Sequence, residues 1–78
     1  MPTIHQLTHA LKICMYADDH APPRFHVKGL GSDVMVGLAD LQVLQGEFDR
    51  RDLAMALSWA GQNRQLLERR WRSLNERD

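Results

Sequence analysis

The side chains most able to do chemistry gather in residues 18–26, which read Asp-Asp-His-Ala-Pro-Pro-Arg-Phe-His. The two histidines can exchange protons near neutral pH, and the arginine can hold an anion through paired hydrogen bonds. Two consecutive prolines fix φ and stiffen the connection, so these polar groups are held on a rigid loop. The segment therefore predicts a polar site but does not define a reaction.

Three interpretations of this segment remain open. In a catalytic one, His20 or His26 acts as general acid or base and Arg24 clamps an anion, as in a small nuclease. In a metal-binding one, His20, His26 and Asp19 supply at most three ligands. Because there is no Cys-x-x-Cys pair and Arg24 repels a cation, we expect no metal and no cofactor. In a structural one, Asp19 orients His20 in a partly buried, hydrogen-bonded corner.

The first half of the chain predicts the strands that position this segment. Strands are expected at residues 11–16, 25–28, 33–38 and 41–44. In the first of them Leu11, Ile13 and Met15 recur with the period of two that is typical of a strand. A Gly-Leu-Gly-Ser stretch between the second and third strands suits a tight hairpin. Short strands joined by short loops favour an antiparallel meander, and alternation places Arg24 and His26 on the same strand face.

The second half of the chain predicts one long helix over residues 50–74. Asp49 is a good N-cap. The apolar positions form one stripe, which comprises Leu53, Leu57, Ala60, Leu67, Trp71 and Leu74. Gly61 and Arg64 disturb the stripe, so either the helix kinks near Gly61 or Arg64 meets a carboxylate over the sheet. Trp71 lies at the centre of the stripe and Trp59 at its edge, so we expect Trp71 to be the deeper core anchor.

These patterns together predict a single α+β domain over residues 1–78. We expect a three- or four-stranded antiparallel sheet over residues 9–46, with one long C-terminal helix packed across it. A chain of 78 residues buries only a small core, so it has room for one domain.

Several stretches together resemble the small bacterial domain-of-unknown-function family 4160. They are Met-Pro-Thr-Ile at residues 1–4, Met-Tyr at 15–16, the segment at 19–26, and a helical pattern of Trp59, Asn63, Leu67 and Trp71. The family signature is D-H-x-P-P-H-F-H, so Arg24 stands where its first His of H-F-H is usual, and Asp49 replaces a common proline. The resemblance implies no established activity. It implies a gene found beside, or fused to, another small uncharacterised domain, sometimes of a toxin–antitoxin kind.

The resemblance and the helical spacing lead to one joint hypothesis about binding. Trp59 and Asn63 are four residues apart and therefore share one helix ridge. If that ridge lies over the strand that carries Arg24 and His26, then Trp59 and Asn63 converge with the whole segment 19–26. The candidate binding residues are Arg24, Trp59, Asn63 and Arg64.

Charge is balanced overall but unevenly distributed. Ten basic residues balance ten acidic ones. Residues 1–49 carry three basic and six acidic residues, and residues 50–78 carry seven arginines and four acids. Zero net charge argues against a general nucleic-acid coat, although nucleic-acid phosphates or an acidic surface could be contacted by Arg69, Arg70 and Arg72. His5 and His9 are expected at the surface.

The sequence also carries expectations about location and role. No apolar run approaches the length of a membrane span, residues 1–5 do not resemble a secretory signal, and Cys14 alone allows no intrachain disulfide, so we expect a cytoplasmic protein. Exposed sheet edges invite a protein partner or a second copy. The favoured function is an interaction component of a small bacterial operon of the toxin–antitoxin kind. The alternative is a small catalytic or anion-binding protein that uses residues 19–26.

Overall fold

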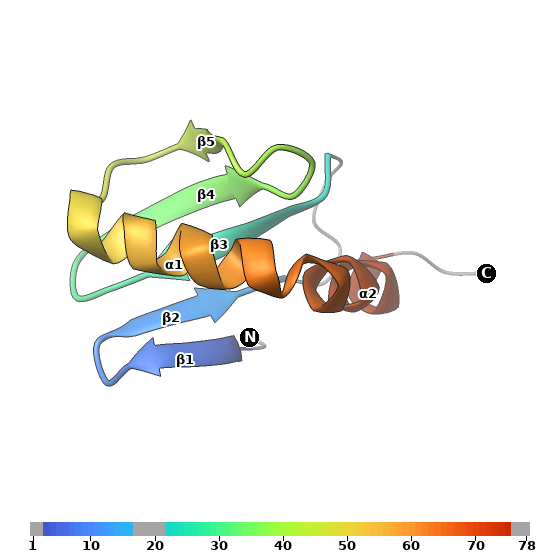
Figure 1. Cartoon of the computed structure of the whole chain (residues 1–78), viewed down its shortest axis with the longest axis horizontal. Coiled ribbons are helices and arrows are strands. Elements are labelled where there is room, and N and C mark those ends of the chain that lie inside the picture. The colour runs from blue at the N-terminus through green and yellow to red at the C-terminus, as the bar shows by residue number, and fades with distance from the viewer. Residues whose placement is uncertain (1–2, 17–21, 76–78) are drawn as a thin grey trace.

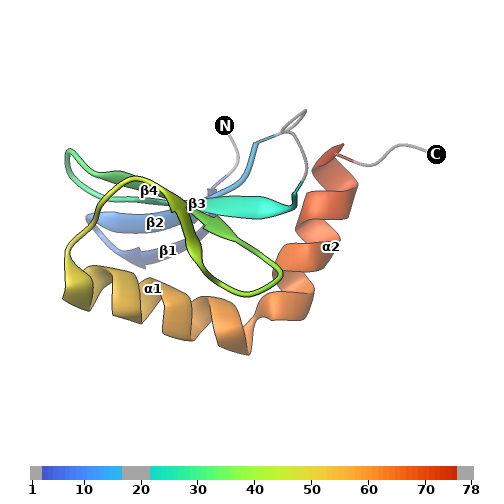
Figure 2. The ribbon, with the colours of Figure 1, turned by 90° about the horizontal axis from the view of Figure 1, so that it is seen from above.

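The computed structural model describes residues 3–16 and 22–75, which form a sheet with one helix along a face and a second helix at its end (Figures 1 and 2). The sheet comprises β1 (Thr3–Thr8), β2 (Leu11–Cys14), β3 (Arg24–Lys28), β4 (Asp33–Gly37) and β5 (Val43–Gln45). Two helices follow, α1 (Arg50–Gln62) and α2 (Arg64–Asn75). The expected α+β class and antiparallel meander are confirmed, because the five strands lie in sequence order and each neighbouring pair is antiparallel.

The sheet has five strands, so the expected three or four strands over residues 9–46 were too few. The missed strand is β1, in which the apolar residues Ile4 and Leu7 are three positions apart. Register shifts between Thr3 and His5 and between Gln6 and Thr8 interrupt its pairing with β2. These irregularities break the period of two, yet Ile4 and Leu7 both still pack against the core. The last strand is Val43–Gln45 rather than residues 41–44.

The expected single long helix is also wrong, since the chain breaks between α1 and α2 at Asn63. Asp49 does cap α1, because its side-chain oxygen accepts hydrogen bonds from the backbone N–H groups of Arg51 (2.9 Å) and Asp52 (3.2 Å). At the other end, the side-chain amide of Asn63 donates to the Trp59 carbonyl oxygen at 2.9 Å. The backbone N–H of Asn63 donates to the same oxygen at 3.0 Å, so Asn63 caps the end of α1 two residues after Gly61. The kink expected near Gly61 is therefore present as a complete break.

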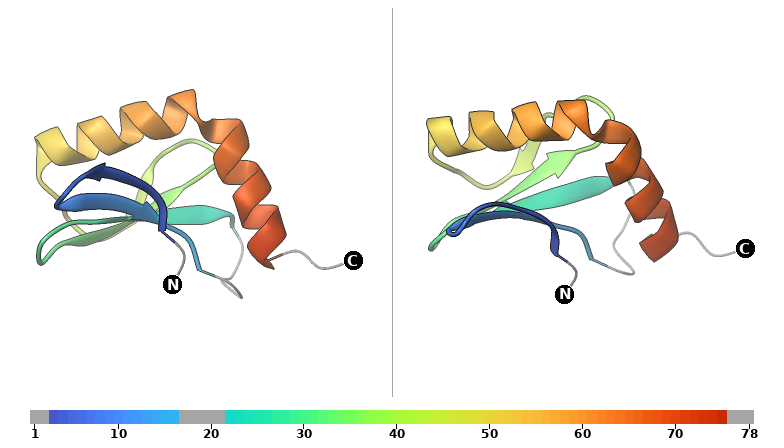
Figure 3. Two further views of the ribbon diagram at one scale, coloured as in Figure 1. Left: turned by 90° about the horizontal axis from the view of Figure 1, so that it is seen from below. Right: turned by 60° about the horizontal axis from the view of Figure 1, so that its bottom comes forward.

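The break turns α2 around the end of the sheet while α1 lies along one face (Figures 2 and 3). Both helices contribute small or apolar side chains to one continuous core. Its fully buried members include Ile13, Phe25, Val27, Val34, Val36, Ala56, Ala60 and Leu67. Trp71 is 5% exposed, whereas Trp59 is only partly buried, which confirms the expected order of the two tryptophans.

The sheet has two chemically different faces. Phe25 and Val27 of β3 are fully buried beneath the helices, so alternation turns Arg24, His26 and Lys28 to the opposite side. We call this opposite side the open face. Strand register adds further side chains to it, namely Gln6, Lys12, Cys14, Asp33 and Met35. In the part of the chain that the structure describes, neither helix covers the open face (Figure 3).

Candidate functional site

The two halves of the candidate segment differ in what the structure describes. Asp19 and His20 lie outside the described residues, so the expected hydrogen-bonded corner stays a prediction. Arg24 and His26 lie on β3 and share the open face, as the alternation predicted. Arg24 donates from Nη1 to the Met35 sulfur at 3.2 Å. The segment thus enters the sheet with its arginine and second histidine directed away from the helices.

His26 is a largely enclosed polar group on the open face. Its side chain is 13% exposed, and Nδ1 lies 3.6 Å from Oδ1 of Asp33. The Tyr16 ring meets the imidazole edge-on, with 4.6 Å between ring centroids. A protonated imidazole at this position forms an ion pair with the Asp33 carboxylate. His26 and Asp33 also line a cavity of about 230 Å³ together with Met35, Gln45 and Gly46. The arrangement places an imidazole and a carboxylate beside a small space, which is the minimum geometry that acid–base chemistry requires.

The expected convergence of Trp59 and Asn63 with Arg24 and His26 does not occur. Trp59 lies on the helix-covered side, where its ring stacks on His5 of β1 at 4.4 Å and 9° between planes. His5 is therefore a partner of α1 rather than a free surface residue. The hypothesis required the helix to lie over the face that bears His26. The larger apolar surface belongs to the Phe25 and Val27 face, so the helix packs there instead.

Arg64 has a structural role at the break between the helices. Its guanidinium donates twice to the Leu38 carbonyl oxygen, from Nε at 3.1 Å and Nη2 at 2.8 Å, and also to the carbonyl oxygen of Ala39. The expected carboxylate over the sheet is replaced by these backbone acceptors; Glu68 lies 3.9 Å away on the same helix. Arg64 thus joins the start of α2 to the loop after β4.

Replacing Arg64 with methionine should destabilise the fold by about 1–3 kcal/mol, because the charged hydrogen bonds to Leu38 and Ala39 are lost. Urea unfolding of both proteins measures this difference. Arg69→Met is the matched control, since Arg69 is exposed on α2, and it should change the free energy of unfolding by less than about 0.5 kcal/mol. Equal effects of the two substitutions would contradict this role for Arg64.

Lys28 is a residue of the open face that the sequence analysis did not single out. Its ammonium lies 3.5 Å from Oδ2 of Asp33 and 5.5 Å from the centroid of the Tyr16 ring. The pKa of Lys28 is raised above its ordinary value of 10.5. The largest cause is hydrogen bonding with the Tyr16 side chain, and attraction to the Asp33 carboxylate adds to it. Lys28 is therefore a full positive charge at neutral pH. The signal available in the sequence was the alternation Arg24-x-His26-x-Lys28, which places three basic side chains on one face.

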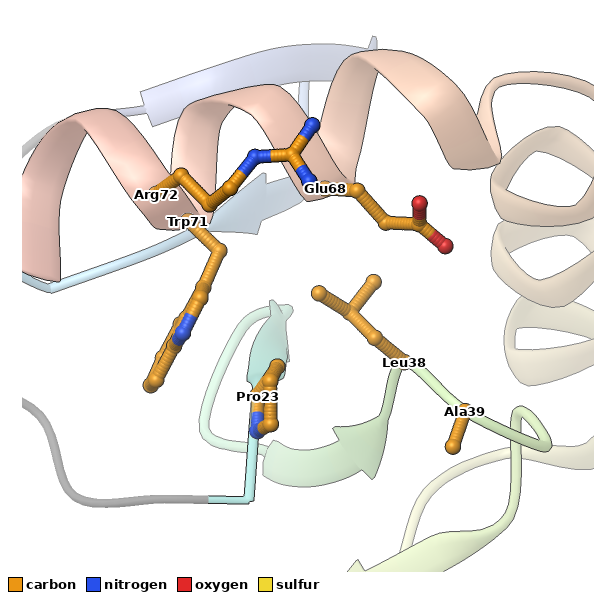
Figure 4. A pocket seen from close by; sticks show the side chains of 6 residues that line it. All are labelled: Pro23, Leu38, Ala39, Glu68, Trp71 and Arg72. Atoms are coloured by element: carbon orange, nitrogen blue, oxygen red, sulfur yellow. The ribbon is translucent and has the colours of Figure 1, made fainter. Parts of the chain in front are cut away.

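A groove of about 260 Å³ lies between α2 and the ends of β3 and β4 (Figure 4). Trp71, Leu38 and Pro23 form its apolar wall, and Glu68 and Arg72 extend over it from α2. The three arginines expected to contact nucleic-acid phosphates are all exposed on α2. They are Arg69, Arg70 and Arg72. The groove thus combines an apolar wall with one acidic and one basic side chain. It suits a ligand that has an apolar body and a polar end.

The described residues also bear on the expectations about metals and membranes. Across residues 3–16 and 22–75, no three His, Cys, Asp or Glu side chains cluster closely enough to hold a metal ion. Of the weak candidates for a metal, only His26 falls within this part of the chain. Neither described helix has the length and apolar character to cross a membrane.

Comparison with known proteins identifies the family to which this chain belongs. Neither the curated proteins nor the solved structures give a match to this chain. One family model does match, over residues 11–72, from the start of β2 into the last turn of α2. The matched range contains the segment at 19–26 and the helical residues Trp59, Asn63, Leu67 and Trp71 on which the resemblance was based. The chain therefore belongs to the family described as Domain of unknown function (DUF4160).

Proposed function

We propose that this protein is an interaction component that binds a protein partner encoded in the same small operon, in a system of the toxin–antitoxin kind. The observation that supports the proposal is the sheet edge at β5. This strand lies at one end of the strand order, and all three of its residues are exposed. Val43 and Leu44 are large apolar residues with exposed fractions of 42% and 46%. Such an edge presents backbone N–H and C=O groups to which a partner strand can add.

The charges around β5 favour a partner of different sequence over a second copy. Residues 29–49 contain four acidic residues, Asp33, Asp40, Glu47 and Asp49, and neither Lys nor Arg. Two copies that pair through β5 would bring these carboxylates together, and like charges across an interface oppose association. A partner segment with alternating apolar and basic residues fits both the exposed Leu44 and the acidic surroundings. Pairing with a second copy of this chain through β5 is the less favoured alternative, because of this charge repulsion.

Substituting Leu44 with lysine should weaken the complex with the product of the adjacent gene by about tenfold or more, because a charged lysine on an edge strand opposes strand addition. Isothermal titration calorimetry with the two purified proteins measures the Kd. Met55→Lys is the matched control, since Met55 is 44% exposed but lies on α1. It should leave the Kd unchanged.

Three results would contradict this assignment of the partner site. The first is a Kd that Leu44→Lys does not change, and the second is an equal loss with Met55→Lys. The third is the absence of any complex with the neighbouring gene product at high concentration. Sedimentation of this protein alone distinguishes the homo-oligomer, which would persist without a partner and dissociate in Leu44→Lys.

A second candidate function is catalysis or anion binding by residues 19–26. It is favoured by one specific observation, the pair formed by the largely buried His26 and the exposed Asp33 beside a small cavity, with Arg24 on the same strand as His26. In this proposal His26 exchanges a proton and Arg24 holds an anionic group, and Asp19 and His20, which lie outside the described residues, are further candidates. Contact of nucleic acid with Arg69, Arg70 and Arg72 is a further proposal, supported by their exposure on α2.

A further inference from the structure

The basic residues of the first 49 positions all lie on the open face of the sheet. They number three, Lys12, Arg24 and Lys28, against six acidic residues in the same part of the chain. Lys12 lies on β2, directly opposite Lys28 on β3, as the register of these strands shows. Residues 1–49 contain more acidic than basic residues, but folding places all three basic side chains on one face of the sheet.

The pairing of Lys12 with Lys28 is unfavourable by itself. Like charges directly opposite each other on neighbouring strands destabilise a sheet. On the described part of the chain Asp33 pairs with Lys28, and no ion pair involves Lys12. The cross-strand row therefore reads Gln6, Lys12, Lys28 and Asp33, with one carboxylate for two ammonium groups. A ligand that carries negative charge would offset this repulsion.

A surface hollow is lined by both lysines. It has a volume of about 230 Å³, and its polar side chains are those of Gln6, His9, Lys12 and Lys28. Ala10, Gly29 and Leu30 also line it and belong to the β1–β2 and β3–β4 turns, which lie at the same end of the sheet (Figure 1). All four polar side chains can donate hydrogen bonds, and no carboxylate lines the hollow. The ammonium groups of Lys12 and Lys28 are both positively charged at neutral pH, as lysines ordinarily are.

We propose that this hollow binds a phosphate group, with Lys12 and Lys28 as its paired cationic contacts and His9 as a third donor. Lysine ammonium groups bind phosphate as compact point charges, and two of them suit a group that carries one to two negative charges. The site is independent of the β5 edge and lies on a different part of the molecule from the α2 arginines. The phosphate can belong to a free phosphate or phosphomonoester, or to the backbone of a single-stranded nucleic acid.

Titration of the full chain, followed by the backbone amide signals in ¹H–¹⁵N NMR spectra, tests this site. The two probes are sodium phosphate and a ten-nucleotide oligouridylate, each compared with sodium chloride at the same ionic strength. We expect saturable shifts at Lys12, Lys28 and Gly29 that chloride does not produce. Lys12→Gln should raise the apparent Kd about fivefold or more, and Arg50→Gln, the control at an exposed position on α1 that does not line the hollow, should not change it.

A measurement of stability separates binding from folding. Because Lys12→Gln removes one member of a like-charge pair, its Tm should equal or exceed that of the parent protein while phosphate binding is lost. Tighter binding of the oligouridylate than of phosphate would assign the site to a nucleic-acid backbone, and equal binding would assign it to a free phosphate or phosphomonoester. The proposal is overturned if chloride produces the same shifts, if Lys12→Gln binds like the parent, or if Arg50→Gln weakens binding as much as Lys12→Gln.

Discussion

Replacing Trp71 with alanine is expected to leave the protein largely unfolded at 37 °C. Trp71 is 5% exposed and packs with Leu67 where α2 closes the end of the core. Removing a buried tryptophan side chain costs about 3–5 kcal/mol. A domain of this size has a total stability of roughly 4–12 kcal/mol, so the loss is a large fraction of it. Thermal unfolding followed by far-UV circular dichroism measures the change in Tm.

Trp59→Ala is the matched comparison, because Trp59 lies on α1 with only part of its ring buried. It should lower the Tm by less than Trp71→Ala. It should also shift the NMR signals of His5, on which the Trp59 ring stacks, and leave those of His26 in place. If Trp59→Ala unfolds the protein and Trp71→Ala does not, the core is anchored through α1 alone and α2 does not close its end.

Replacing Gly46 with alanine is expected to destabilise the fold by about 2–5 kcal/mol. Gly46 has a φ of +98°, which side chains disfavour. A Cβ at this position would lie 2.5 Å from the Asp33 carbonyl oxygen and 3.1 Å from the Val34 Cα. Both are backbone atoms of β4, so the chain after β5 must move away from the sheet. Urea unfolding gives the free energy, and hydrogen exchange should show that amide protection falls most in β5.

Gly31→Ala provides a control that isolates the backbone contribution. Gly31 also has a positive φ, +78°, but a Cβ there meets nothing within 4 Å. It should cost about 1 kcal/mol, for the backbone conformation alone. The difference between the two substitutions then measures how tightly the segment after β5 is held against β4. Equal costs would mean that Gly46 is required only for its φ, and that β5 is held less closely than the structure indicates.

The features that the sequence predicted correctly are decided within a few residues. The alternation of Leu11 and Ile13 marks β2, the Gly-Leu-Gly-Ser stretch marks the β3–β4 hairpin, and Asp49 marks the start of α1. In that hairpin the Gly29 N–H donates to the Ser32 carbonyl oxygen at 2.9 Å. Each of these signals depends on a backbone preference or a nearby hydrogen bond, so no distant residue is needed to interpret it.

The features that were missed depend on residues far apart in the chain. The strand β1 lacks a regular period because its pairing with β2 is bulged, and it is stabilised by burial of Ile4 and Leu7 against distant core residues. The helix break could be suspected from Gly61, but Asn63 and Arg64 decide its position. Arg64 does so through carbonyl groups of Leu38 and Ala39, which belong to the loop after β4.

Local patterns in the chain were enough to predict the α+β class, most of the strands, the start of the helical region and the deeper burial of Trp71. Packing between distant elements sets which sheet face α1 covers, and with it the separation of Trp59 from His26. It also sets Lys12 and Lys28 opposite each other. The physical reason is that periodicity and capping act over one or two turns of chain. Strand register and the choice of a buried face are set instead by the sum of apolar contacts over the whole sheet.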